Sequence, residues 1–215
     1  MNVQAAPERR TNGAVAPAIE LTVVVPTFKE RDNVPLVVEH LDRVLAGIAW
    51  EVVFVDDDSP DGTADVVRAL AARDKRVRVI QRIGRRGLAT ACVEGVLSSS
   101  APVFAVMDGD LQHDDSKLPE MYRQLVDGHL DIVVGSRYVS GGSSDGLSSD
   151  YRQWASDTGG RVARLILKAD LSDPMSGFFV MARPAFDAAV RNLSGQGFKI
   201  LLDLFVSSPE PLRFA

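Results

Sequence analysis

The feature that most constrains the fold is a regular alternation of short apolar runs and helical repeats between Leu21 and Val134. Runs such as 21–25 and 103–107 are typical of buried parallel strands, and apolar residues three and four apart follow them. Five strands alternating with four helices predict an α/β fold, a doubly wound and mostly parallel sheet. The strands are expected at 21–25, 51–55, 77–81, 103–107 and 131–134, and the helices at 36–45, 63–72, 88–98 and 117–126.

The two ends of the chain differ from this regular middle. Residues 1–19 show no periodicity and are expected to form a disordered N-terminal tail, which leaves 20–215 as one domain. The last residues resemble the beginning of a further strand, so we expect the chain to be truncated at its C-terminus. After Gly135 we expect a Gly- and Ser-rich loop at 140–150, a strand at 178–181, and helices at 151–169, 184–191 and 199–206.

Composition and charge exclude several classes of function. A formal net charge of −5 gives no general attraction for nucleic acid, so no nucleic-acid partner is expected. Cys92 is the single cysteine, which rules out an internal disulfide and favours a small buried side chain there. No segment approaches the ~20 apolar residues of a membrane-spanning helix, and no apolar stretch follows Arg9 and Arg10 as a secretory signal requires. A cytoplasmic location is the simplest expectation.

The strongest chemical signal is Asp108-Gly109-Asp110, which directly follows the apolar run that ends at Met107. Two carboxylates at the carboxyl end of a parallel strand suit a hard divalent cation such as Mg²⁺ or Mn²⁺. Gly109 would let the backbone approach a ligand closely, and Gln112 is placed to add another oxygen. Asp and Gly also form ordinary surface turns. Ligands bind at this edge of an α/β sheet, which favours the metal-site interpretation.

Two further polar segments follow the first and second strands. The first, Pro26 to Glu30, offers a proline that would end the strand, a Phe28 ring that could pack on a base or ribose, and an acceptor at Glu30. In the second, the consecutive carboxylates 56–58 repel one another unless donors such as base N–H groups or ribose hydroxyls lie nearby. Residues 61–63 (Asp-Gly-Thr) are interpreted as a turn before a helix. The sequence has no Gly-x-Gly-x-x-Gly after the first strand and no Walker-type loop, which removes the main support for dinucleotide and P-loop sites.

Basic and polar residues in the irregular second half indicate an anion site. Arg137 lies in a Gly-Ser-Arg-Tyr segment, and Arg152 and Ser156 are four residues apart, which would place them on one helix face. Guanidinium groups match phosphate geometry, so these residues could bind a donor diphosphate or an anionic acceptor, although isolated arginines are more often solvated or paired. His113, next to the acidic segment, is interpreted as positional rather than as a ligand or a base.

Taken together, six segments resemble family 2 glycosyltransferases with the GT-A fold, and within that family the polyprenyl-phosphate (dolichol-phosphate) mannosyltransferase branch. Each segment is weak alone, but all of them in family order are a specific signal that covers nearly everything after Glu20. They are Val-Pro-Thr-Phe-Lys-Glu-Arg-Asp-Asn (25–33), Val-Asp-Asp-Asp-Ser-Pro-Asp-Gly-Thr (55–63), Gly-Leu-Ala-Thr-Ala (87–91), Met-Asp-Gly-Asp-Leu-Gln-His (107–113), Gly-Ser-Arg-Tyr (135–138) and Asp-Pro-Met-Ser-Gly-Phe (173–178).

The chain also departs from this branch. Phe28 stands where relatives commonly carry Tyr, and Lys29 where they commonly carry Asn, but the aromatic face is kept. Relatives continue past the end of this chain into another strand and a basic Gly-Glu-Ser segment, and many carry membrane helices.

The resemblance implies a Rossmann-like α/β/α sandwich and an inverting transfer of mannose from GDP-mannose to a polyprenyl or dolichyl phosphate, with Mg²⁺ or Mn²⁺. It implies a protein peripheral to the cytoplasmic face of the membrane, with a membrane-spanning partner or a further C-terminal membrane segment. Asp108, Asp110 and Arg137 would be catalytic. The nucleotide-sugar would be bound by Pro26, Thr27, Phe28, Glu30, Asp56, Asp58, Asp108, Gly109, Asp110 and Arg137, the metal by Asp108, Asp110 and Gln112, and the acceptor phosphate by Arg137, Arg152 and Ser156.

Three alternatives stay open. The donor could be UDP-glucose or another UDP-sugar with the same lipid acceptor, because side-chain geometry selects the base and the sugar. A truncated chain could also be a non-catalytic module that binds a nucleotide-sugar. A nucleotidyltransferase is disfavoured, because such enzymes carry a Gly-rich loop near the first strand and residues 26–30 contain no glycine.

Overall fold

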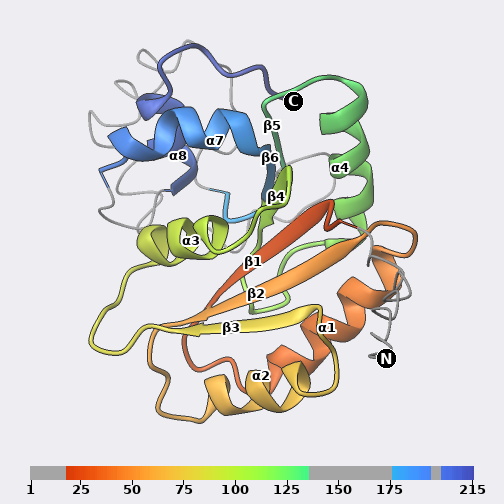
Figure 1. The fold of residues 1–215 in the computed structure, drawn as a ribbon, viewed down its shortest axis with the longest axis vertical. Coiled ribbons are helices and arrows are strands. Elements are labelled where there is room, and N and C mark those ends of the chain that lie inside the picture. The colour runs from red at the N-terminus through yellow and green to blue at the C-terminus, as the bar shows by residue number, and fades with distance from the viewer. Residues whose placement is uncertain (1–17, 136–175, 195–199) are drawn as a thin grey trace, which may run out of the picture.

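The apolar runs form a single mixed sheet, in a computed structural model that describes residues 18–135, 176–194 and 200–215. Within these residues the strand order is β3-β2-β1-β4-β6-β5 (Figure 1). The strands are β1 (Leu21–Thr27), β2 (Trp50–Asp56), β3 (Val77–Gln81), β4 (Val103–Val106), β5 (Ile132–Val134) and β6 (Phe179–Ala182). The expected α/β class and mostly parallel sheet are confirmed.

The first four strands form the parallel part of the sheet. β1 lies between β2 and β4, with Leu21 paired to Trp50 on one side and to Val103 on the other. β3 pairs in parallel with the outer side of β2. The carboxyl ends of β1, β2 and β4 therefore meet at one edge, as the alternating pattern predicts.

The second part of the sheet departs from simple alternation. β6 pairs antiparallel with both β4 and β5 and separates them, with Val106 and Val134 each opposite Phe179. A strand that returns from the edge where β5 ends must run in the opposite direction, and the sequence pattern of 178–181 gives no sign of direction. In this arrangement residues 176–178, which directly precede β6, lie at the same edge of the sheet as the end of β4.

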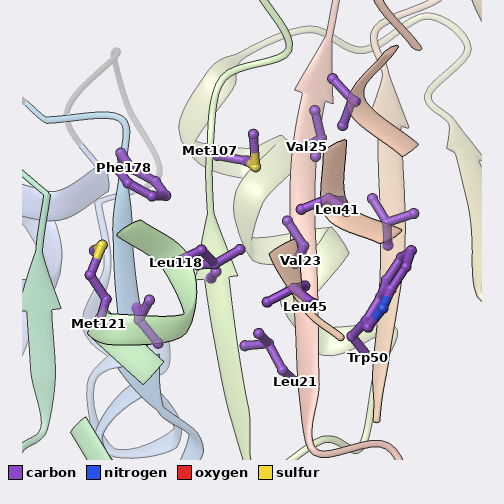
Figure 2. Close-up of a cluster of buried hydrophobic side chains, with 14 of the residues drawn as sticks. Leu21, Val23, Val25, Leu41, Leu45, Trp50, Met107, Leu118, Met121 and Phe178 are labelled. Carbon is purple, nitrogen blue, oxygen red and sulfur yellow. The ribbon is translucent and has the colours of Figure 1, made fainter. Parts of the chain in front are cut away.

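Helices cover both faces of the sheet and bury alternate residues of each strand. α1 (Asn33–Val44) and α4 (Leu118–Asp127) pack on the face that carries Val23 and Val25 (Figure 2). α2 (Thr63–Ala71) packs on the same face through Val67. α3 (Leu88–Leu97), α7 (Arg183–Ala189) and α8 (Ile200–Ser207) pack on the face that carries Val24 (Figure 1). Each fully buried Val or Phe contributes roughly 1.5–3 kcal/mol relative to an exposed one. β1, β2 and β4 are mostly apolar and almost entirely buried because helices shield both of their faces from water, whereas β3, at the edge of the sheet, is only partly buried.

The element boundaries agree with the sequence predictions to within a few residues for all helices and strands that fall in the described ranges. Short 3₁₀ turns at Asp115–Lys117 and Val190–Asn192 extend α4 and α7. The loop expected at 140–150 and the helix at 151–169 lie outside the described residues. Near the end of the chain, Phe214 forms an isolated parallel bridge with Ile132. None of the described helices is long and apolar enough to cross a membrane.

Candidate active site

Three loops meet at the carboxyl edge of the parallel strands, after β1, β2 and β4. The Asp57 N–H donates to Thr27 O (3.0 Å), and the Lys29 N–H donates to Ser59 Oγ (2.9 Å), so the first two loops are bound to each other. Gly109, in the third loop, is buried, and a Cβ built on it would lie 3.3 Å from Val25 Cγ1 and 3.4 Å from Thr27 Cγ2. The missing side chain of Gly109 therefore allows the third loop to pack closely against the end of β1.

Pro26 does not end its strand, contrary to expectation, because β1 continues to Thr27. In a parallel strand every second residue bonds to the same neighbour. Val24 O accepts from the Met107 N–H on the β4 side, so Pro26 also faces that side, just beyond the last pair of the β1–β4 ladder. A residue without an N–H is tolerated there because no strand partner is left to receive it.

The Phe28 side chain is 41% exposed at the tip of the first loop. The guanidinium of Arg86 lies 4.6 Å from the ring centroid, and Lys29 Nζ lies 5.4 Å from it. Glu30, in the same loop, is only partly exposed, and its Oε2 accepts from Asn33 Nδ2 at 2.6 Å. This part of the site thus combines an accessible aromatic ring with one cation from its own loop and one from the loop after β3, a surface suited to a flat ring that carries phosphate groups.

The consecutive carboxylates of the second loop have three different environments. Asp56 is 0% exposed, and its oxygens accept from the Ser59 N–H (2.9 Å), the Ser59 hydroxyl (2.6 Å) and the Thr27 hydroxyl (3.3 Å). Asp57 points to Arg82 (Oδ1–Nη1, 2.7 Å). Asp58 is partly exposed, and its Oδ1 accepts from Gln81 Nε2 at 2.9 Å. Asp56 and Thr27 thus shape the loops from within, while Asp58 is open to a ligand.

The turn at 61–63 forms as the sequence predicts. Gly62, with φ 86°, is the N-cap of α2, which begins at Thr63. Burial opposes ionisation of Asp61, but hydrogen bonds from the Thr63 hydroxyl, the Thr63 N–H and the Arg31 N–H outweigh it and hold the pKa of this carboxyl below its usual value. This end of the second loop is therefore structural.

A buried arginine links the second loop to the loop that follows β3. Arg82 is 2% exposed and donates to Asp57 Oδ1, to Gly87 O (2.9 Å) and to Thr90 Oγ1 (2.5 Å), and its Nε lies 3.3 Å from Glu94 Oε1. The second Asp57 oxygen accepts from the Gly87 N–H at 2.7 Å. This network fixes the course of the 82–87 loop. Neither Arg82 nor Arg86 can be identified from the sequence, because nothing in the pattern distinguishes them from surface arginines.

The acidic turn after β4 carries two carboxylates of unequal exposure. The Asp108 side chain is 38% exposed, and its Oδ2 lies 2.9 Å from His113 Nε2. Asp110 is exposed, and its Oδ1 accepts from the N–H of Gln112 at 3.0 Å. The turn contains Leu111 at φ 61°.

Backbone strain is concentrated at the same edge of the sheet. Four non-glycine residues have positive φ among those that the structure describes, and three of them, Lys29, Asp58 and Leu111, lie one in each loop. Such residues cost of order 1–3 kcal/mol each and persist where the surroundings hold them in place, often at binding sites. The strain supports a functional role for these loops.

The donor atoms at this edge fit a hard divalent cation. Asp108 and Asp110 offer carboxylate oxygens, and Gln112 an amide oxygen on an exposed side chain. Within the described ranges no group of three or more His, Cys, Asp or Glu side chains could hold a metal ion on its own. Mg²⁺ is commonly bound by one or two carboxylates together with waters and substrate phosphates. Asp108 and Asp110 therefore suit a cation that arrives with a diphosphate.

Arg137, Arg152 and Ser156, the expected acceptor-phosphate residues, lie outside the described residues. Cys92 is buried beneath this edge, on α3. Burial raises the pKa of its thiol far above the usual value, and the nearby Asp108 carboxylate raises it further. Its position agrees with the expected role as a small buried side chain.

Comparison with known proteins identifies relatives along most of the chain. The family model described as "Glycosyl transferase family 2" matches residues 22–189. A protein of Pyrococcus furiosus named dolichol-phosphate mannosyltransferase is 36% identical over 190 residues, which cover 87% of this chain and 53% of the relative. A protein of the same name from Saccharomyces cerevisiae is 36% identical over 202 residues, 90% of this chain and 73% of the relative. The chain thus spans little more than half of the first relative and about three quarters of the second.

Solved structures share the fold at lower sequence identity. Glucosyl-3-phosphoglycerate synthase from Mycobacterium tuberculosis, in complex with Mg²⁺ and uridine diphosphate, superposes with a TM-score of 0.63 at 18% identity, over 86% of this chain and 62% of that one. The same enzyme with Mn²⁺, UDP-glucose and phosphoglyceric acid gives a TM-score of 0.62. At this identity the likeness establishes the GT-A fold alone.

Proposed function

The chain belongs to glycosyl transferase family 2, and from this membership we propose that it transfers mannose from GDP-mannose to a polyprenyl or dolichyl phosphate. Relatives 36% identical to it are named dolichol-phosphate mannosyltransferase, which supports this donor and this acceptor. The observation that carries the proposal is that Asp108 and Asp110, after β4, lie at the same edge of the sheet as the exposed Phe28 ring, after β1.

The donor is proposed to lie across the three loops. Phe28 would pack against the base or ribose, and Arg86, whose guanidinium lies 4.6 Å from the Phe28 ring centroid, would contact the same group or the diphosphate. Asp58 would accept from base or ribose donors, whereas Asp56 would act indirectly by holding Ser59. Pro26, Thr27, Glu30 and Gly109 would shape the floor of the site, since their contacts are mostly with neighbouring loops.

Asp108, Asp110 and Gln112 are proposed to hold Mg²⁺ or Mn²⁺ beside the donor diphosphate. The cation would neutralise charge that develops on the diphosphate as the sugar leaves. The acceptor phosphate oxygen forms a bond to the anomeric carbon while the bond from that carbon to the diphosphate breaks, and the bonding electrons leave with GDP. A phosphate monoester is already ionised near neutral pH, so the residues have to position the reactants rather than remove a proton.

The acceptor phosphate is proposed to bind Arg137, Arg152 and Ser156, with Arg137 also close to the donor. The acceptor is a lipid, so we place the protein at the cytoplasmic face of a membrane, held there by a further segment or a membrane-spanning partner.

Transfer of radiolabel tests this function. The protein is incubated in detergent with dolichyl phosphate, Mn²⁺ and either GDP-[¹⁴C]mannose or UDP-[¹⁴C]glucose, and the organic phase is counted. We expect label in the lipid from GDP-mannose and its loss with a chelator. If label enters the lipid only from UDP-glucose, UDP-glucose replaces GDP-mannose as the proposed donor. Metal-dependent GDP binding without transfer from either donor would favour a binding module.

A further inference from the structure

The His113 side chain is buried although it lies in an exposed turn. Its side chain is 4% exposed, whereas its neighbours Gln112 and Asp114 are exposed. Leu111, with its left-handed backbone, lies two residues before it. A polar ring turned inward from a surface loop needs partners that satisfy it.

The imidazole has a polar partner and an apolar one. His113 Nε2 lies 2.9 Å from Asp108 Oδ2, and an ionised carboxylate only accepts, so Nε2 donates in this contact. The flat face of the ring stacks on Phe178, with centroids 5.3 Å apart and an interplanar angle of 25°. The aromatic contact sets the plane of the ring, and that plane aims Nε2 at the carboxylate.

Phe178 is itself held by the ends of β5 and β6. The Gly135 N–H donates to Phe178 O (2.9 Å), and the Phe178 N–H donates to Ser176 Oγ (3.1 Å). The Ser176 hydroxyl is 2.6 Å from Gly135 O. A Cβ on Gly135 would lie 2.4 Å from the Phe178 ring, so the ring fits closely over this backbone. The ring on which His113 stacks is therefore held by hydrogen bonds of its backbone and by close packing over Gly135.

The Gly177 backbone lies directly against the Asp108 carboxylate. A Cβ on Gly177 would lie 2.4 Å from Asp108 Oδ2 and 2.9 Å from Oδ1. The carboxylate thus sits against a backbone that leaves no space for a side chain. The hydrogen bond from His113 and the close contact with the Gly177 backbone together restrict rotation of the Asp108 carboxylate about its Cβ–Cγ bond.

We infer that His113 is a positioning residue for the proposed metal site, and that its Nε2–H holds Oδ2 of Asp108 so that the carboxylate faces an incoming cation. This rests on the proposed function, in which Asp108 binds Mg²⁺ or Mn²⁺. Hydrogen-bond partners of metal-binding carboxylates fix ligand orientation, and their loss typically costs 10–100-fold in metal affinity. His113 then acts through Asp108 and touches neither the cation nor the substrate.

Two substitutions separate the hydrogen bond from the stacking. His113→Phe keeps an aromatic ring for Phe178 but has no donor, and His113→Gln places an amide N–H close to the position of Nε2 without the ring. The readout is the ratio of the GDP dissociation constants measured by calorimetry with a chelator and with Mn²⁺. Thermal unfolding of each variant reports any effect on the fold alone.

We expect His113→Phe to lower this ratio roughly tenfold or more, and His113→Gln to retain most of it. An unchanged ratio in His113→Phe, or an equal loss in both variants, would overturn the positioning role, because a purely structural histidine would change thermal stability and leave the ratio unaltered. Wild-type protein that binds neither GDP nor UDP with Mn²⁺ would contradict the proposed function itself.

Discussion

Arg82 Nη1 lies 2.7 Å from Asp57 Oδ1, so a nearly buried ion pair joins the loop after β3 to the loop after β2. The other Asp57 oxygen accepts from the Gly87 N–H, which closes the same loop from its far end. The 82–87 loop carries Arg86 to the face of Phe28. The ion pair therefore affects the candidate donor site indirectly, because it holds in place the loop that carries Arg86.

Arg82→Met should lower the free energy of unfolding by about 3 kcal/mol, because it leaves the mostly buried Asp57 carboxylate without its cation. Urea unfolding measures the loss. The double variant Arg82→Met/Asp57→Asn should recover part of it, since a neutral amide needs no counterion. Equal losses in the single and double variants would show that the charge of Asp57 is not what Arg82 stabilises.

Phe28→Ala should weaken GDP binding roughly tenfold or more, because stacking of a base on an aromatic ring is worth about 1–3 kcal/mol. Phe28→Tyr keeps the ring face and serves as the matched control, with an affinity close to wild type. Calorimetric titration with GDP in the presence of Mn²⁺ compares the variants. Wild-type affinity in Phe28→Ala would remove this ring from the donor site.

Gly95→Ala should destabilise the protein, because a Cβ there would lie 2.4 Å from Val24 Cγ1 and 3.0 Å from Val55 Cγ2. Overpacking costs roughly 1–3 kcal/mol, and the better helix propensity of Ala offsets about 1 kcal/mol of it. Urea unfolding should show a net loss of up to about 2 kcal/mol. Leu97→Ala, at an exposed position of the same helix, should change stability by less than about 0.5 kcal/mol. Equal effects of the two substitutions would refute close packing of α3 at Gly95.

Asp74 should make stability depend on pH. Hydrogen bonds from Arg76 hold the pKa of the Asp74 carboxyl below its usual value, although burial opposes this. A folded-state pKa below the unfolded value of about 3.9 gives stability that is present above that pH and is lost as pH falls through the folded-state pKa. Asp74→Asn should cost about 0.5–1 kcal/mol at neutral pH, and the difference from wild type should vanish in acid. Urea unfolding across this pH range checks both, and a difference that persists at the acid end would contradict the assignment.

The sequence predicts the elements well and their spatial order less well. The run at 103–107 becomes β4, which is buried on both faces, and the run at 77–81 becomes β3, a partly buried edge strand, because short runs rich in β-branched residues favour strands. The place of β6 between β4 and β5 depends on the path of the connecting chain, which residue types do not encode. Pro26 was expected to end β1, but the β4 ladder has already ended on its donor side, and only the sheet order reveals this.

The candidate site divides in the same way. Asp108, Asp110 and Phe28 could be placed at one edge from sequence, since parallel strands deliver their carboxyl ends together. The sequence does not distinguish the three consecutive aspartates from one another, yet Asp56 is buried while Asp58 is partly exposed. Gly177 approaches Asp108 only because β6 returns beside β4, so no local pattern could identify it.

The most direct test of the central claim is calorimetric binding of GDP with Mn²⁺ and with a chelator, in wild-type protein and in Asp110→Ala. We predict metal-dependent binding to the wild type that falls roughly tenfold or more in Asp110→Ala. Asp127→Ala, which removes an exposed carboxylate at the end of α4, should bind as wild type does. Binding that is indifferent to the chelator, or equal in Asp110→Ala and wild type, would contradict a donor site built on the two carboxylates after β4.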